Sequence, residues 1–319
     1  MAPWAVASRA SGKPGAPVVW REGVHLTGTP IWCDARRRRD VCFASSADRV
    51  GAAGHGQLIA TPVTLALVGA PADAGHLAVP LRRPFTLGTL RLELIASGRC
   101  LGAAALHVDS RGRTVLYAGP IRTIDPAPGE MAAEVRACDA LVIAAPFGAE
   151  HHAFRPVAEV AEQLLAWLRT ERTAGRVPTV VVDTPLDGLE LATHLIAAGR
   201  FVAAGKLVRD AAARIEGAPK LAATARDADV IVRTERDRVA TGSPTALVSG
   251  RALDPHDYAA GFAWPFTAGR AELLAWIEQT RARDVFVTGA AAEAIVAALG
   301  ARGHVLGPPR QMTLFEAAR

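Results

Sequence analysis

Residues 40–49 read DVCFASSADR, a short β-forming segment that runs into a cluster of polar side chains. The pattern predicts a strand over 40–45, followed by Ser45, Ser46 and Asp48 in a loop. The rest of the first half repeats this alternation of short strands and turns. Further strands are expected over 17–27, 30–35, 57–61, 77–96 (two strands split at Gly88), 101–108, 113–118 and 140–145, with a short helix over 62–69 opened by Pro62.

The second half of the chain alternates helices with buried strands. The clearest helix is expected over 156–174, where Val157, Val160, Leu164 and Leu168 fall on one stripe. We expect further helices over 189–198, 271–281 and 291–299, and strands over 179–183, 228–232, 245–249 and 284–288. A β-rich half followed by alternating helices and strands predicts a layered α/β fold with an inserted unit.

Composition excludes several classes of protein. The chain has 319 residues, of which 50% are hydrophobic and 21% are charged, so it can bury a sizeable core and is not a disordered polyampholyte. No apolar run approaches the roughly 18 residues of a membrane span. Segment 1–15 lacks an apolar stretch before a cleavage site, so we expect a cytoplasmic protein without a secretory signal. The four cysteines are far apart and are expected to be core thiols.

The basic residues are almost all arginine. Lysine occurs only at 13, 206 and 220, and the net charge is +5. Guanidinium groups bind phosphate bidentately, so a nucleic-acid partner is permitted, although a GC-rich coding sequence would also enrich arginine. The run Arg36 to Arg39 has the same two interpretations, a solvated loop or a phosphate-binding one.

Eight segments, in order along nearly the whole chain, resemble the β-CASP nuclease branch of the metallo-β-lactamase fold. They are 31–37 (IWCDARR), 42–51, 58–62 (LIATP), 96–102 (ASGRCLG), 115–119 (VLYAG), 141–148 (LVIAAPFG), 247–253 (LVSGRAL) and 285–289 (VFVTG). The nearest likeness is to the bacterial exonucleases associated with DNA ligases. The resemblance implies an αββα four-layer sandwich with an inserted β-CASP-like α/β cap.

The same resemblance implies the domain organisation. The first part of the sandwich is expected over 1–150, the cap over 151–248, the return to the sandwich over 249–307, and a tail over 308–319.

Members of that family hold two metal ions, commonly zinc, between their sheets. In this sequence the metal-ligand positions are degenerate. Of the seven residues that usually bind the metals, only Asp48 is retained. The degenerate active-site positions, which include these seven, are Ala44, Ser46, Asp48, Arg49, Arg99, Pro120, Ala144, Thr267 and Gly289, while Asp34 matches the first-motif aspartate that mainly orders the loop. One carboxylate cannot hold a dizinc centre, and Arg49 and Arg99 would repel a divalent ion. We therefore expect no catalytic residues, no metal and no cofactor.

Other catalytic patterns are absent from the sequence. There is no phosphate-binding GxxxxGK[ST] loop and no GxSxG elbow. Seven of the nine histidines share no spacing. The adjacent pair His151 and His152 is expected to consist of solvated loop residues whose side chains point in different directions.

The C-terminal tail follows Pro308 and Pro309. Within it, Gln311, Leu314 and Phe315 look like the short peptide with which bacterial repair and replication proteins bind the sliding clamp. Packing of the tail onto its own domain is the alternative.

Three functions follow as hypotheses. The first is a catalytically inactive relative of the β-CASP exonucleases that binds nucleic acid, or repair partners such as the clamp, a DNA ligase or an active nuclease paralogue. Its nucleic-acid-binding candidates are Arg36, Arg37, Arg49 and Arg99. The second is an active metal-dependent phosphodiesterase or exonuclease with a relocated or misassigned metal site that uses Asp34 and Asp48. The third is a protein–protein interaction module without nucleic-acid binding.

Overall fold

The computed structural model describes residues 16–50, 54–70, 75–222, 224–237 and 243–308. Its first sheet contains six strands in chain order. They are β1 (Val18–Trp20), β2 (Val24–Leu26), β3 (Ile31–Cys33), β4 (Val41–Phe43), β5 (Gln57–Ala60) and β6 (Leu77–Ala78). The first three pair antiparallel and the rest pair parallel. Helix α1 (Pro62–Val68) follows β5, starting at the Thr61 cap and ending at Gly69 in the left-handed conformation.

The second sheet has seven strands in the order β18-β17-β11-β10-β9-β8-β7. They are β7 (Phe85–Leu87), β8 (Leu90–Ala96), β9 (Ala104–Ser110), β10 (Arg113–Gly119), β11 (Ala140–Ala144), β17 (Asp284–Thr288) and β18 (Gly303–Val305). Helix α5 (Arg270–Thr280) precedes β17, and helix α6 (Ala292–Leu299) follows it. Strands β9 and β10 pair antiparallel and form a hairpin that turns at Arg111 and Gly112, which both have positive φ.

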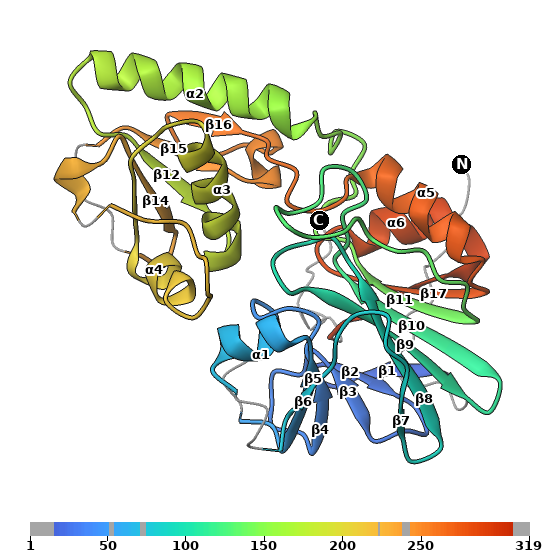
Figure 1. Cartoon of the computed structure of the whole chain (residues 1–319). Coiled ribbons are helices and arrows are strands. Elements are labelled where there is room, and N and C mark those ends of the chain that lie inside the picture. Colours follow the sequence, from blue (N-terminus) through green and yellow to red (C-terminus); the bar gives the residue numbers. More distant parts are fainter. Residues whose placement is uncertain (1–15, 51–53, 71–74, 223, 238–242, 309–319) are drawn as a thin grey trace, which may run out of the picture.

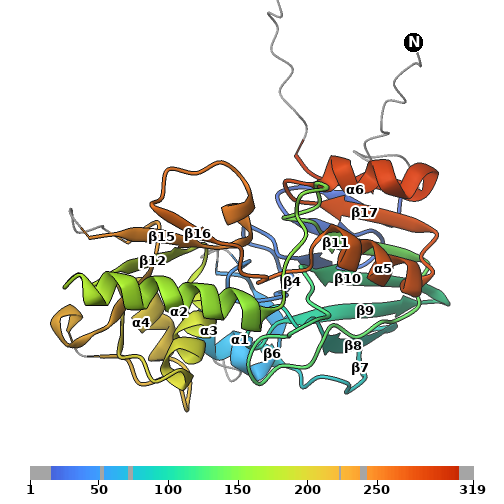
Figure 2. The ribbon, with the colours of Figure 1, turned by 90° about the horizontal axis from the view of Figure 1, so that it is seen from above.

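These two sheets share one apolar core, to which Leu26 and Phe43 contribute from the first sheet and Leu92 and Leu106 from the second. Helices α5 and α6 cover the outer face of the second sheet. Helix α1 packs on the outer face of the first sheet through Leu65. The sequence of layers is helix, sheet, sheet, helix, and we call this part the sandwich unit (Figures 1 and 2).

The remaining elements form a separate unit around a parallel sheet of order β13-β14-β12-β15-β16. Its strands are β12 (Thr179–Val182), β13 (Val202–Ala204), β14 (Val230–Thr234), β15 (Thr245–Val248) and β16 (Ala260–Phe262), and its helices are α2 (Val157–Thr173), α3 (Pro185–Ala197) and α4 (Lys206–Ala212). The apolar stripe predicted for α2 is buried against this sheet. We call this part the cap unit; β16 belongs to it, so the predicted boundary at 248 is too early.

The elements that the sequence did not predict are short. Strands β13, β16 and β18 have three residues each, too few to show a period-2 pattern. Helix α3 begins four residues before the predicted start of 189, with Thr184 as its cap and Pro185 in its first turn.

All four cysteines are buried and free, as predicted, and burial raises the pKa of each thiol. Among the described residues, no helix is long and apolar enough to cross a membrane.

Two buried arginines of the sandwich unit join it to helix α3 of the cap unit. Arg122, only 1% exposed, donates from Nη1 to Glu190 Oε1 at 2.7 Å. Trp264 donates from Nε1 to the same oxygen at 3.1 Å. Arg99 reaches Asp187, one turn earlier on α3. A charge buried this deeply needs its partner, so these pairs fix how the two units meet.

Gly98 sets the path of the backbone into Arg99. Its φ is +69°, and a Cβ atom there would lie 2.1 Å from the carbonyl oxygen of Arg122. We expect Gly98→Ala to lower the free energy of unfolding by about 3 kcal/mol or more. An alanine at this positive φ would be strained, and its Cβ atom would clash with the backbone of Arg122, which cannot move without disturbing its neighbours. Gly28→Ala is the matched control, since Gly28 has φ +79° with nothing within 4 Å, and it should cost about 1 kcal/mol. Urea unfolding of both variants checks this; equal losses would contradict it.

Candidate functional site

The loop after β4 is held by Asp34, which follows β3 and is buried. Its Oδ1 accepts a hydrogen bond from the Ser45 backbone N–H at 2.8 Å. Its Oδ2 accepts from Ser45 Oγ at 2.6 Å, from Tyr117 Oη at 2.8 Å and from Arg49 Nε at 2.8 Å. Asp34 therefore orders the loop, as the resemblance implied, and its counter-charge is the guanidinium of Arg49. Burial and Asp34 raise the pKa of Tyr117, which keeps its hydroxyl as a donor.

Asp48 belongs to a second, deeper cluster with Arg99 and Asp187. Arg99 Nη1 lies 2.7 Å from Asp187 Oδ1, and Arg99 Nη2 lies 3.9 Å from Asp48 Oδ2. Burial would lower the pKa of the Arg99 guanidinium, but its acidic neighbours, chiefly Asp187, outweigh burial and raise that pKa. One guanidinium thus faces two buried carboxylates. Burial raises the pKa of Asp48 to about 6 despite the opposing effect of Arg99.

These side chains do not fit a dizinc centre. Ala44, Pro120 and Ala144 are buried without a ligand atom in their side chains, and Gly289 has no side chain. Ser46 and Thr267 are buried and offer only hydroxyl groups. Arg49 and Arg99 add positive charge, which a divalent ion cannot approach without a larger excess of carboxylates.

Two cavities meet at Arg49. We call the first the arginine cleft; its volume is about 600 Å³. It is lined by Trp20, Cys33, Asp34, Arg36, Asp48, Arg49, Val50, Tyr117 and Arg236. Arg36 and Arg236 are exposed, and neither forms an ion pair with another described residue. This cleft therefore brings together three guanidinium groups and two carboxylates. One of these carboxylates, Asp34, already accepts four hydrogen bonds from protein donors.

The second cavity, about 680 Å³, is called the histidine cleft. It is lined by Arg49, Ala144, Pro146, Phe147, Ala149, His151, His152, Asp183, Arg251, Asp254, Gly289, Ala290, Ala291, Glu293 and Ala294. The degenerate positions Ala144 and Gly289 thus lie in one cavity with Arg49. Ser46, Arg99, Pro120 and Thr267 line neither cleft.

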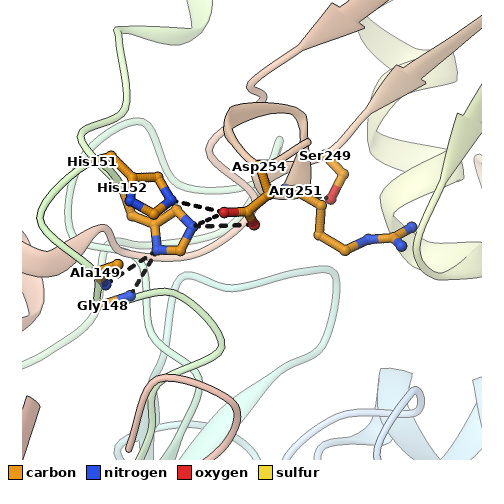
Figure 3. A network of polar contacts seen from close by, with 7 residues as sticks. All are labelled: Gly148, Ala149, His151, His152, Ser249, Arg251 and Asp254. Carbon is orange, nitrogen blue, oxygen red and sulfur yellow. Dashed lines mark hydrogen bonds and ion pairs between the residues drawn. The ribbon is translucent and has the colours of Figure 1, made fainter. Parts of the chain in front are cut away.

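The expectation for the adjacent histidines is right for the exposure of His151 but wrong for His152 and for the direction of the two side chains. Both rings turn toward the Asp254 carboxylate, which lies in the loop between β15 and β16 (Figure 3). His151 Nε2 lies 2.7 Å from Asp254 Oδ1, and His152 Nε2 lies 3.3 Å from both carboxylate oxygens. His152 is also buried rather than solvated. A tight turn at 148–152 lets neighbouring side chains converge, which simple adjacency does not reveal.

This cluster has the donor set of a metal site, since its three ligand atoms lie within 4.8 Å of one another. The hydrogen bonds of His152 argue otherwise. Its Nδ1 accepts from the backbone N–H groups of Gly148 and Ala149, each at 3.2 Å. A neutral ring must then carry its proton on Nε2, the atom that a metal would need. The cluster fits a hydrogen-bonded clasp between the two units, and the two histidines lower the pKa of Asp254.

The other arginine candidates have distinct environments. Arg37 pairs with Glu22, and Arg39 lies 3.8 Å above the ring of Trp32. Arg99 is buried and paired, so its guanidinium is not open to a phosphate group, contrary to its candidate role. Gln311, Leu314 and Phe315 lie outside the described residues.

Several residues of this region were not predicted from the sequence. Asp187 and Glu190 lie three positions apart on α3 and so share a helix face, a signal that was present in the sequence. Trp20, Arg236 and Asp254 carried no signal, because only the fold brings them to the clefts.

Comparisons with known proteins add a likeness of fold. No protein-family model and no curated protein matches this chain. The structure is similar to the crystal structure of a protein of unknown function from Enterococcus faecalis V583, with a TM-score of 0.53 and 12% sequence identity, covering 85% of this chain and 80% of that chain. At this identity the likeness concerns the mixed α/β fold alone.

The raised pKa of Asp48 predicts a pH-dependent effect of Asp48→Asn. An acid whose folded pKa is about 6, above its ordinary value of 3.8, contributes full stability below about pH 4 and loses it as the pH rises through 6. The variant removes this charge, so it should be more stable than the wild type at pH 7.5 by about 2–3 kcal/mol, and most of that gain should vanish at pH 4.5.

Urea unfolding at the two pH values measures this effect. Asp257→Asn, at an exposed position, is the control and should change stability by less than about 0.5 kcal/mol at either pH. An Asp48→Asn variant that is less stable than the wild type at pH 7.5 would mean that the attraction of Arg99 outweighs burial.

Proposed function

We propose that this protein is a non-hydrolytic relative of the β-CASP exonucleases that binds the phosphate groups of DNA in its arginine cleft. The layer order of the sandwich unit and the parallel sheet of the cap unit agree with a metallo-β-lactamase-like αββα sandwich carrying a β-CASP-like cap. A scaffold role in DNA repair in the cytoplasm belongs to the same proposal, as does binding of the sliding clamp through Gln311, Leu314 and Phe315.

The observation that carries the proposal is the charge at the positions of the expected metal ligands. Arg49 places its guanidinium against Asp34, and Arg99 places its own against Asp48 and Asp187. Protein cations thus compensate the carboxylates that would otherwise attract metal ions. A phosphate group in the arginine cleft would still be close to positive charge, here from guanidinium groups in place of two metal ions. Guanidinium groups do not activate a water molecule for hydrolysis as metal ions do.

Phosphate binding follows from the accessible guanidinium groups. Arg36 and Arg236 are exposed on opposite units, and Arg49, with about a third of its side chain exposed, lines the same cleft. Arginine forks bind phosphate oxygens bidentately, and a partly enclosed cleft strengthens such contacts relative to open solvent. The histidine cleft, lined by Asp183, Asp254 and Glu293, is a poorer site for an anion.

An active phosphodiesterase with a relocated metal site is the alternative, and the His151, His152 and Asp254 cluster is its candidate centre. The hydrogen bonds to His152 Nδ1 weigh against it. Manganese- or zinc-stimulated cleavage of a nicked or single-stranded oligonucleotide would favour the alternative. An interaction module without nucleic-acid binding would show no salt-dependent DNA affinity.

Arg36→Ala/Arg236→Ala tests the proposal without touching a buried ion pair. Fluorescence anisotropy with a labelled 20-nucleotide single strand, between 50 and 300 mM KCl, gives the affinity and its salt slope. We expect the double variant to bind about 10-fold more weakly and to lose about one to two units of slope, because each arginine neutralises one phosphate group.

The control is Arg91→Ala/Arg169→Ala, which removes two exposed arginines that line neither cleft. It should bind nearly as tightly as the wild type. Equal losses in both double variants would mean that binding follows net charge rather than the cleft. No salt-dependent binding by the wild type would end the proposal.

A further inference from the structure

Trp20 differs from the other tryptophans that the structure describes. Trp32 stacks on His25, with ring centroids 4.6 Å apart, and also contacts the guanidinium of Arg39. Trp167 and Trp264 contact other rings, and Trp276 is buried. Trp20 is half-buried and has no ring or cation partner among the described residues.

Trp20 packs against the sandwich core and also lines the arginine cleft. A ring that the core holds on one side is a rigid apolar surface for a ligand on the other side. In the same cavity, Arg36, Arg49 and Arg236 provide sites for an anion. An aromatic surface beside several guanidinium groups suits a ligand that has both a flat ring and a phosphate group.

We infer that the arginine cleft holds one nucleotide unit, with its base stacked on Trp20 and its phosphate group bound by Arg36 and Arg236. This inference rests on the proposed function and adds a residue that contacts the base. Stacking does not read sequence, since every base has a π-face, so the site distinguishes a strand with bases from a bare sugar–phosphate chain.

The test compares two 20-nucleotide single strands of equal charge, oligothymidylate and a chain of abasic residues. The wild type should bind oligothymidylate about 5- to 100-fold more tightly than the abasic chain. Trp20→Leu keeps an apolar side chain on the core and should reduce this ratio to about 1, leaving the affinity for the abasic chain unchanged. Trp20→Phe should restore part of the ratio, which a purely structural role would not predict.

Trp32→Leu is the matched control, because Trp32 is also half-buried but lines neither cleft, and it should retain the wild-type ratio. Equal binding of the two strands by the wild type would overturn the inference while leaving phosphate binding intact. Absence of binding to either strand would instead overturn the proposed function.

Discussion

Arg99 and Arg122 reach from the sandwich unit into helix α3, where Asp187 and Glu190 face them. Removing one partner of such a buried pair leaves an uncompensated charge and typically costs about 3–5 kcal/mol. The two pairs therefore determine the position of the cap unit, and with it the width of the arginine cleft. Gly98 is part of the same constraint, because only a residue without Cβ passes the Arg122 carbonyl on the way to Arg99.

The pairing of carboxylates with arginines also explains why we propose phosphate binding without hydrolysis. A dinuclear hydrolase needs several carboxylate and imidazole groups directed at one point. Here the surviving carboxylates, Asp34 and Asp48, are turned to arginines of the protein itself. Burial raises the pKa of Asp48 although the neighbouring Arg99 opposes this effect. We propose that a cleft arranged in this way binds a phosphate chain without cleaving it, and that Trp20 adds a stacking contact to a base.

Much of the fold could be predicted from the sequence, because long amphipathic elements such as α2 and the alternating strands β8 to β10 carry their own pattern. Strand β16 could not, because its three residues pair only through the fold. The role of Asp34 followed from the resemblance. The convergence of His151 and His152 on Asp254, and the burial of Arg99 against Asp187, depend on contacts between distant segments that no local pattern encodes.

We propose that guanidinium groups stand at the positions where β-CASP nucleases hold metal ions. Elemental mass spectrometry of tag-free protein, purified without a chelator, tests it most directly. The account predicts substantially less than one zinc or manganese ion per chain. One or two ions per chain, retained through gel filtration and lost on substitution of Asp48 by alanine, would contradict it and would make a hydrolase the better interpretation.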